Sequence, residues 1–238
     1  MERIADQRYL LNDQYKDSSK LSARIQLHEL FSTNTHGWMP WVFDHFVDLP
    51  EDARILELGS GRGSLWKENL SRVPSGWYIT LSDLLPGMRD NAKMNLEKAG
   101  REFAYKNIDA QAIPYPDDTF DGVVANHMLY HVPDRAKAVA EIHRVLKSGG
   151  CLFAATNGRG SMRALWEMIN TVAPPFVSEF GRPANRFTLE SGEVELRKKS
   201  PMLWSTVMRT NCMLQRSSRS LTTFGLRVVN SQTRRSRN

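Results

Sequence analysis

The sequence predicts an α/β fold, a doubly wound and mostly parallel sheet with helices on both faces. Along residues 53–157 short apolar runs alternate with amphipathic segments, which is typical of buried strands and their covering helices. The composition, 41% hydrophobic and 24% charged over 238 residues, lies in the ordinary globular range and allows a well-buried core. We expect a helical cap at 1–50, a main domain at 51–195 and a basic tail at 196–238 that is disordered or atypical.

The elements are expected in a regular order. Residues 16–32 have apolar side chains at helical spacing, and residues 35–49 contain a cluster of aromatic side chains. We therefore expect two helices in the cap. The expected strands of the main domain are 53–59, 76–83, 103–109, 121–126 and 151–157, and the expected helices between them are 63–73, 86–100 and 134–150. In such a sheet a ligand lies at the carboxyl ends of the strands, near the switch in strand order.

A glycine-rich turn follows the first expected strand. The stretch "ILELGSGRGSLW" has glycines at 59, 61 and 63, and glycine lets the backbone approach a ligand closely. The dinucleotide fingerprint needs glycine where this chain has Ser64, and the Gly-Lys-Ser/Thr ending of a phosphate-binding P-loop is absent. Glu57, just ahead of the turn, disfavours a pyrophosphate and attracts a cation. The pattern therefore indicates a positively charged ligand without phosphate.

Two further acids follow later strands. Asp83 closes the second strand, where a carboxylate can accept hydrogen bonds from both hydroxyls of a ribose. Asp109 follows the third strand and could accept the exocyclic amine of adenine, although an Asp in a loop is often only a turn former. A ribose, an adenine and a cation together describe S-adenosylmethionine.

Four segments then occur in order at compatible spacing. They read "ELGSGRG", "LSDLLPGM", "NIDAQAIPYPDDTFDGVVANHMLYHVPD" and "AEIHRVLKSGG". Together they resemble the successive motifs of class I S-adenosylmethionine-dependent methyltransferases, in the branch of the ubiquinone and menaquinone methyltransferases. The resemblance covers about residues 50–160 and implies a Rossmann-like fold and methyl transfer to a small-molecule acceptor. Ser60 and Arg62 stand where the family usually has Cys and Thr, and Ser148 where it usually has Pro; these are mild changes.

The resemblance also implies roles for individual residues. Gly59, Ser60 and Gly61 would pass beside the methionine part of the cofactor, with Glu57 shaping the turn. The remaining implied contacts are Asp83 on the ribose, Leu84 against the adenine, Asp109 and Ala110 at the adenine edge, and Asn126 near the amino group. A helix ahead of the sheet commonly closes such sites, so Tyr15 and Arg24 are further candidates, with Arg24 pairing the cofactor carboxylate.

A candidate acceptor site follows the fourth strand. His131 is the first candidate for a general base if the acceptor must lose a proton; the competing interpretation is a histidine that only holds its loop. Trp38, Trp41, Met128 and Tyr130 could line an apolar pocket, and core packing is the alternative for the two tryptophans.

The net charge of +6 comes from the tail. Residues 196–238 contain ten Lys or Arg and no acid, which leaves 22 basic and 26 acidic residues before them. Only residues 224–229, "FGLRVV", are typical of a strand in this segment. The sequence therefore gives doubtful support for the final edge strands of the sheet. Three interpretations stay open for this segment, namely disorder, RNA binding and translation from a shifted reading frame.

Few other features bear on function. Cys151 and Cys212 lack a CxxC or Cys/His partner, so no metal site or disulfide framework is predicted. No signal peptide or membrane span is recognisable, which favours a cytoplasmic protein. A protein that binds the cofactor without catalysis, or an RNA-associated methyltransferase that uses the tail, remains the alternative to a small-molecule enzyme.

Overall fold

The computed structural model describes Leu30 and residues 34–161, 163–174, 187–197, 203–214 and 217–229. The first predicted helix, 16–32, lies outside the described residues except for Leu30. The second is present as α3 (Trp38–Phe43), which is followed by the 3₁₀ turn η3 (Asp44–Phe46).

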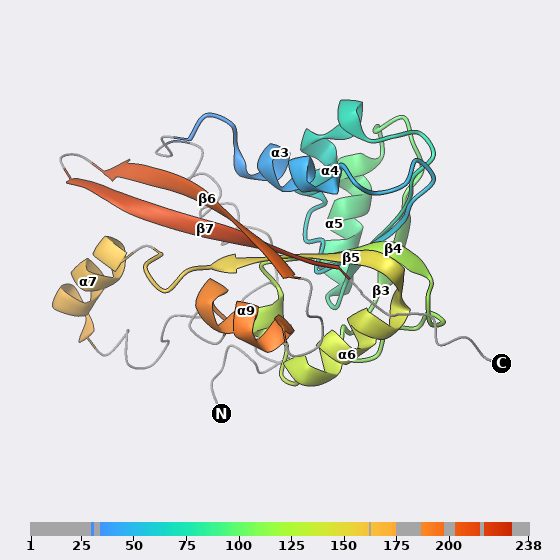
Figure 1. Ribbon diagram of the computed structural model, residues 1–238. Coiled ribbons are helices and arrows are strands. Elements are labelled where there is room, and N and C mark those ends of the chain that lie inside the picture. Colours follow the sequence, from blue (N-terminus) through green and yellow to red (C-terminus); the bar gives the residue numbers. More distant parts are fainter. Residues whose placement is uncertain are drawn as a thin grey trace.

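A single sheet organises the described part of the chain (Figure 1). Its order is β3-β2-β1-β4-β5-β7-β6. The first five strands run parallel to their neighbours, and β7 joins β5 in the antiparallel direction. Their bounds are β1 (Arg54–Leu58), β2 (Tyr78–Asp83), β3 (Ala104–Asn107), β4 (Phe120–Asn126), β5 (Leu146–Asn157), β6 (Leu203–Leu214) and β7 (Ser217–Val229). This arrangement confirms the predicted doubly wound fold, and the order reverses between β1 and β4, where such folds bind ligands.

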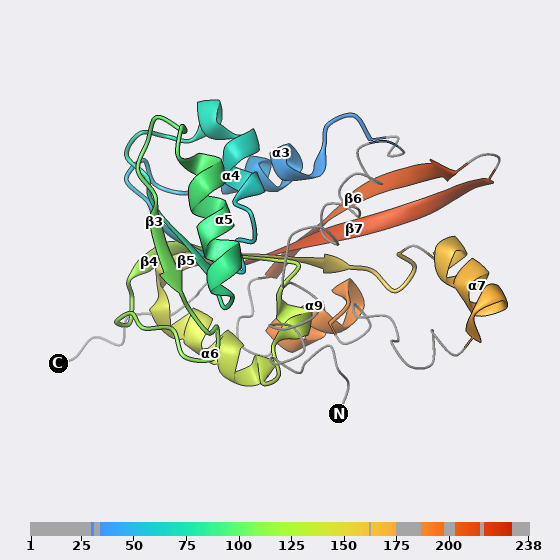
Figure 2. The ribbon, with the colours of Figure 1, turned by 180° about the vertical axis from the view of Figure 1, so that it is seen from behind.

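Helices cover the sheet on both faces, as both views show (Figures 1 and 2). One face carries α3, α4 (Ser64–Glu68) and α5 (Pro86–Leu96), and the other carries α6 (Arg135–Val145) and α9 (Leu189–Arg197). Short 3₁₀ turns, η4 (Leu70–Arg72) and η5 (Leu129–His131), follow α4 and β4. The helix α7 (Arg163–Val172) lies apart from the others at the far end of β5.

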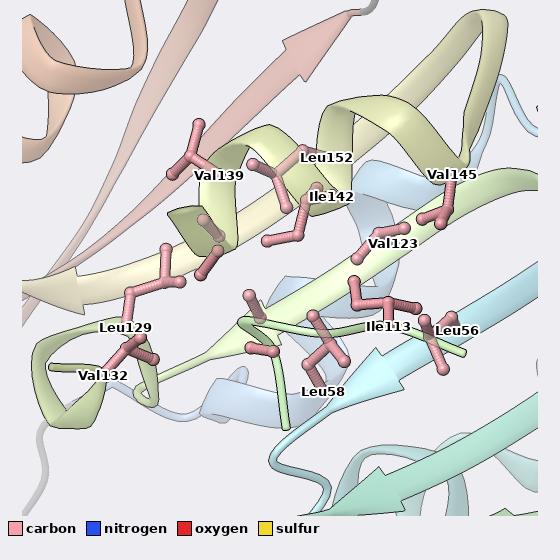
Figure 3. Close-up of a cluster of buried hydrophobic side chains, with 14 of the residues drawn as sticks. Leu56, Leu58, Ile113, Val123, Leu129, Val132, Val139, Ile142, Val145 and Leu152 are labelled. Carbon is pink, nitrogen blue, oxygen red and sulfur yellow. The ribbon is translucent and has the colours of Figure 1, made fainter. Parts of the chain in front are cut away.

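Two buried clusters lie on the two faces. The cluster beneath α6 is mostly aliphatic and packs Val139, Ile142 and Val145 of the helix on Val123 and Leu152 of the sheet (Figure 3). The opposite cluster, beneath α3, α4 and α5, contains five aromatic side chains: Phe43, Phe46, Trp66, Trp77 and Phe153. Both clusters are nearly inaccessible to solvent, so burial of apolar area on both faces stabilises the sheet.

Several element bounds differ from the sequence prediction, and the helices expected over 86–100 and 134–150 end at Leu96 and Val145. The helix expected over 63–73 ends at Glu68, because the chain turns into η4 and Asn69 donates from its side chain to the Leu65 carbonyl oxygen, 2.8 Å away. The fifth strand starts at Leu146, earlier than the expected 151, and its register against β4 shifts between Phe120 and Gly122.

The expectation of a single strand in the C-terminal segment was wrong. Instead of one strand at 224–229, the structure has a hairpin in which Leu203–Leu214 pairs with Ser217–Val229. Residues 223–229 also pair with Cys151–Asn157 of β5. The physical reason is the open edge of β5, whose backbone groups need partners, together with the Thr and Val content of both segments, which favours strands. The three-part division of the chain stays a prediction.

Within the described residues, no helix is long and apolar enough to cross a membrane.

Candidate functional site

The turn after β1 is held open by three glycines. Gly59, Gly61 and Gly63 have φ of 67°, 54° and 72°, a region that L side chains rarely adopt. A Cβ on Gly59 would lie 2.8 Å from the Met128 Cβ, and one on Gly63 would lie 2.9 Å from Leu96 Cδ1. A Cβ on Gly61 would meet nothing within 4 Å. The turn is therefore packed on two sides and faces open space at Gly61.

Asp83 ties this turn to the end of β2. Its Oδ2 accepts a hydrogen bond from the Gly61 N–H (3.1 Å), and its Oδ1 accepts one from the Leu85 N–H (3.0 Å). Burial raises the pKa of Asp83, and these backbone donors act in the opposite direction. Carboxylate oxygens have about four lone-pair sites in total, so the group keeps acceptor capacity beyond its backbone hydrogen bonds, as the hydroxyls of a ribose require.

Glu57 lies inside the protein beneath the turn. Its side chain is buried, and its Oε2 accepts a hydrogen bond of 2.7 Å from the Trp66 indole N–H. Burial raises the pKa of Glu57 to about 7, the Trp66 bond lowers it, and the nearby Asp83 carboxylate raises it. The Ser82 hydroxyl donates to the Glu57 carbonyl oxygen at 2.7 Å, which fixes β1 against β2.

The end of β3 lies next to Asp83. The Ile108 N–H donates to the Asp83 carbonyl oxygen at 3.2 Å, which brings Asp109 and Ala110 to the same edge as Leu84. The Asp109 Oδ1 accepts from the main-chain and side-chain nitrogens of Gln111, at 2.9 and 3.1 Å. Asp109 thus shapes its own turn, and its predicted contact with adenine stays a prediction.

Two buried polar atoms, one at the end of β4 and one in the turn after β1, have no hydrogen-bond partner among the described residues. Asn126 is the last residue of β4, and its Nδ2 is buried and makes no hydrogen bond. The Ser60 hydroxyl in the turn is also buried and makes no hydrogen bond. Buried polar groups are normally satisfied, so these two atoms fit a site that a polar ligand completes. The contact of Asn126 with the amino group of the ligand, which the resemblance implies, stays a prediction.

A row of aromatic rings runs from α3 to η5 beyond Asn126. Trp41 stacks on Trp38 (5.2 Å between ring centroids), Trp38 contacts His127 (5.2 Å), His127 contacts Tyr130 (6.4 Å), and Tyr130 contacts His131 (4.5 Å). His127 has a φ of 52°, a strained backbone for a residue with a side chain. The four half-buried rings and the buried Tyr130 form an amphipathic wall beside the turn.

The structure thus brings together most of the predicted site. The turn and the ends of β2, β3 and β4 contain Glu57, Gly59, Ser60, Gly61, Asp83, Leu84, Asp109, Ala110, Asn126 and His131. Tyr15 and Arg24 lie outside the described residues. Sequence reasoning missed the contact between Trp66 and Glu57; a tryptophan on the short helix directly after the turn was the available signal. Among the described residues, no group of three or more His, Cys, Asp or Glu could hold a metal ion.

The sequence matches known proteins over the same region. Residues 56–154 match a family model described as a methyltransferase domain. The chain is 34% identical over 102 residues to the ubiquinone/menaquinone biosynthesis C-methyltransferase UbiE of Pectobacterium carotovorum, covering 42% of this chain and 41% of the relative. It is 36% identical over 99 residues to the demethylmenaquinone methyltransferase of Thermus thermophilus, covering 42% and 44%. The chain therefore spans less than half the length of these curated relatives.

Solved structures show the same fold. A SAM dependent methyltransferase from Aquifex aeolicus superposes with a TM-score of 0.61 at 17% identity, over 90% of this chain and 98% of that one. A SAM-dependent methyltransferase from Methanosarcina mazei gives 0.56 at 21% identity, over 79% and 96%. The sequence matches confirm the resemblance inferred from the four motifs, and these structures confirm the fold.

Proposed function

We propose that this chain, whose residues 56–154 form a class I methyltransferase domain, transfers a methyl group from S-adenosylmethionine to a small-molecule acceptor. The observation that carries the proposal is Asp83, whose two oxygens are fixed by the Gly61 and Leu85 N–H groups at the end of β2. A carboxylate held in this way suits the paired hydroxyls of a ribose. The open space at Gly61 and the unpartnered atoms of Ser60 and Asn126 fit the rest of such a ligand.

The cofactor, when bound, supplies a methyl group on a positively charged sulfur. The protein residues bind and orient it. The acids Glu57 and Asp83 give the region beside the turn a negative character, which favours a cation over a pyrophosphate. Orienting two reactants in line can contribute on the order of 7 to 11 kcal/mol to the lowering of the barrier.

The aromatic row supports an apolar, planar acceptor. Trp38, His127 and Tyr130 present ring faces and edges beside the end of β4, and aromatic rings bind planar apolar molecules by offset or edge contacts. The names of the two curated relatives point to quinone precursors, which belong to this class. His131, which lies at the end of the row, is the candidate general base if the acceptor is a hydroxyl or an activated carbon.

Charge argues against a nucleic acid as the acceptor. Residues 1–195 contain more acidic than basic residues, 26 against 22, which is unsuited to a polyanion. The basic segment 196–238 is the reason to test the RNA-associated alternative. The cytoplasmic location expected from the sequence stays a prediction.

Two measurements test the proposed function. Calorimetry should show binding of S-adenosylmethionine and of its demethylated product, and no comparable binding of a nicotinamide dinucleotide; the reverse result would reject the cofactor. Labelled cofactor should then transfer its methyl group into a small molecule of a metabolite extract. Cofactor binding without transfer to any extract fraction would support a non-catalytic binding protein, and transfer into bulk RNA would support the RNA-associated alternative.

A further inference from the structure

The buried pair of Trp66 and Glu57 lies directly beneath the glycine turn. Trp66 is fully buried on α4, and a buried indole N–H normally finds a hydrogen-bond acceptor. Its acceptor here is the Oε2 atom of Glu57, at 2.7 Å. A main-chain carbonyl would satisfy the indole equally well, as happens for Trp77, whose N–H donates to the Pro50 carbonyl oxygen at 2.8 Å. The choice of a carboxylate as the acceptor needs a separate explanation.

Glu57 has no counter-charge within the described part of the chain. Its carboxylate is buried and no Lys, Arg or His forms an ion pair with it there. The charged group that acts on it from β2 is Asp83, which has the same sign. On β4 its neighbour is the apolar Val124, and Phe43 and Phe46 pack on Trp66 from α3 and η3. On α4, Lys67 and Glu68 point to solvent.

A buried carboxylate without a cation is unfavourable when it is ionised. The Trp66 N–H offsets part of this cost, because a donor stabilises the charged form. A ligand cation in the site would supply the charge that the described residues lack.

We propose that Trp66 is a positioning residue that holds the Glu57 carboxylate as the counter-charge for the cationic part of the bound cofactor, so that binding of the cofactor releases a proton from Glu57. This inference rests on the proposed function, because it takes S-adenosylmethionine as the ligand. The free protein holds Glu57 partly protonated near neutral pH, since burial raises its pKa to about 7. The cofactor then binds best to the ionised form.

The experiment measures cofactor affinity against pH with the full chain. We expect S-adenosylmethionine to bind about tenfold more weakly at pH 6 than at pH 8, because one pH unit below the pKa only about a tenth of the carboxyl is ionised. Calorimetry at pH 7 in two buffers of different ionisation enthalpy should show release of about half a proton. In Trp66→Phe the ring stays and the donor is lost, so the midpoint of the affinity curve should move to higher pH and binding should recover above it.

The chain offers a matched control. Trp77→Phe removes an indole donor from the same aromatic cluster without touching Glu57, so it should leave the midpoint in place. Glu57→Gln should remove the transition near pH 7, and any response that survives in it belongs to Asp83. If Glu57→Gln fails to fold, the comparison of the two tryptophan variants carries the test.

The outcomes separate the two proposals. Affinity that does not change between pH 6 and 8, or equal midpoints in Trp66→Phe and Trp77→Phe, would overturn the role of Trp66 while leaving the proposed function intact. Absence of cofactor binding at every pH would reject the proposed function, and this inference with it.

Discussion

The two faces of the sheet are built from different kinds of side chain. Beneath α6 the core is mostly aliphatic, with Val139, Ile142 and Leu152 packed without directional contacts (Figure 3). Beneath α3, α4 and α5 it is aromatic, and two of its rings, Trp66 and Trp77, also make hydrogen bonds. One of these bonds reaches Glu57, close to the glycine turn. The aromatic face therefore connects its packing to Glu57 beside the glycine turn, whereas Val139, Ile142 and Leu152 on the other face contribute packing alone.

This difference predicts different tolerance to substitution. Aliphatic cores accept changes of similar volume at a cost below about 1.5 kcal/mol, since nothing in them depends on direction. A buried ring with a polar handle fixes both position and orientation. Changes at Trp66 should alter cofactor binding together with stability, and changes at Val139, Ile142 or Leu152 should alter stability only.

The largest effect is expected where the polar network reaches the ligand. In the proposed function, Asp83→Ala would remove two charge-assisted hydrogen bonds to the ribose, at about 1.5 to 3 kcal/mol each, so affinity for S-adenosylmethionine should fall by about 10²- to 10⁴-fold. Calorimetry measures this loss. Asp121→Ala is the control, because Asp121 also accepts a main-chain N–H, from Arg54 at 2.9 Å, but away from the glycine turn. Equal affinities in the wild type and Asp83→Ala would remove Asp83 from the site.

The next effect concerns the aromatic cluster itself. Phe46 is 1% exposed and lies 4.6 Å from the Phe153 ring, centroid to centroid. Phe46→Ala should lower the free energy of unfolding by about 3 to 5 kcal/mol, because it leaves a cavity between rings that cannot collapse. Urea denaturation gives this value, and Phe46→Leu should recover a large part of it. A loss below about 1 kcal/mol in Phe46→Ala would show that this face is loosely packed.

A pH effect of intermediate size should come from Glu57. Its pKa rises from 4.5 to about 7 on folding, so between these values the folded protein holds more protons than the unfolded chain. The contribution of Glu57 to stability is then present at low pH and is lost as the pH rises through about 7, by roughly 3 kcal/mol. Urea denaturation of the wild type and of Glu57→Gln at pH 5 and pH 8 measures it. A difference between the two proteins that is the same at both pH values would contradict the assignment.

The smallest effect is expected on the aliphatic face. Ile142→Val removes one methylene group from α6 and should cost about 0.5 to 1.5 kcal/mol of stability, with the affinity for the cofactor unchanged. Denaturation and calorimetry on the same preparation check both statements. A change in affinity comparable with the change in stability would break the distinction between the two faces.

The sequence predicted the positions of the glycine turn and of Asp83, because both depend on local patterns. Apolar runs reveal β1 and β2; the glycines at 59, 61 and 63 come after the first strand, and Asp83 ends the second. The structure connects the two through the Gly61 N–H. The bond from Trp66 to Glu57 could not be predicted in the same way, since it depends on how α4 lies against β1.

The hairpin of β6 and β7 shows a second limit of local patterns. Its segments lack the clean alternation of apolar and polar residues and contain no acids, so they resembled an unstructured tail. The strands exist because a partner is available at the edge of β5, far away in the sequence. Pairing of this kind is a tertiary effect, and strand propensity depends strongly on such context.

The late position of β7 in the chain also bears on how the protein is made. During synthesis, the parallel strands and the helices α3 to α6 are complete once Asn157 has left the ribosome, but β5 then has an open edge until residues 223–229 follow. Contacts between segments so distant in sequence form slowly, and an unpaired edge can pair with another chain in the meantime. The hairpin therefore acts as the closing step of folding, and newly made chains should depend on chaperones most during this interval.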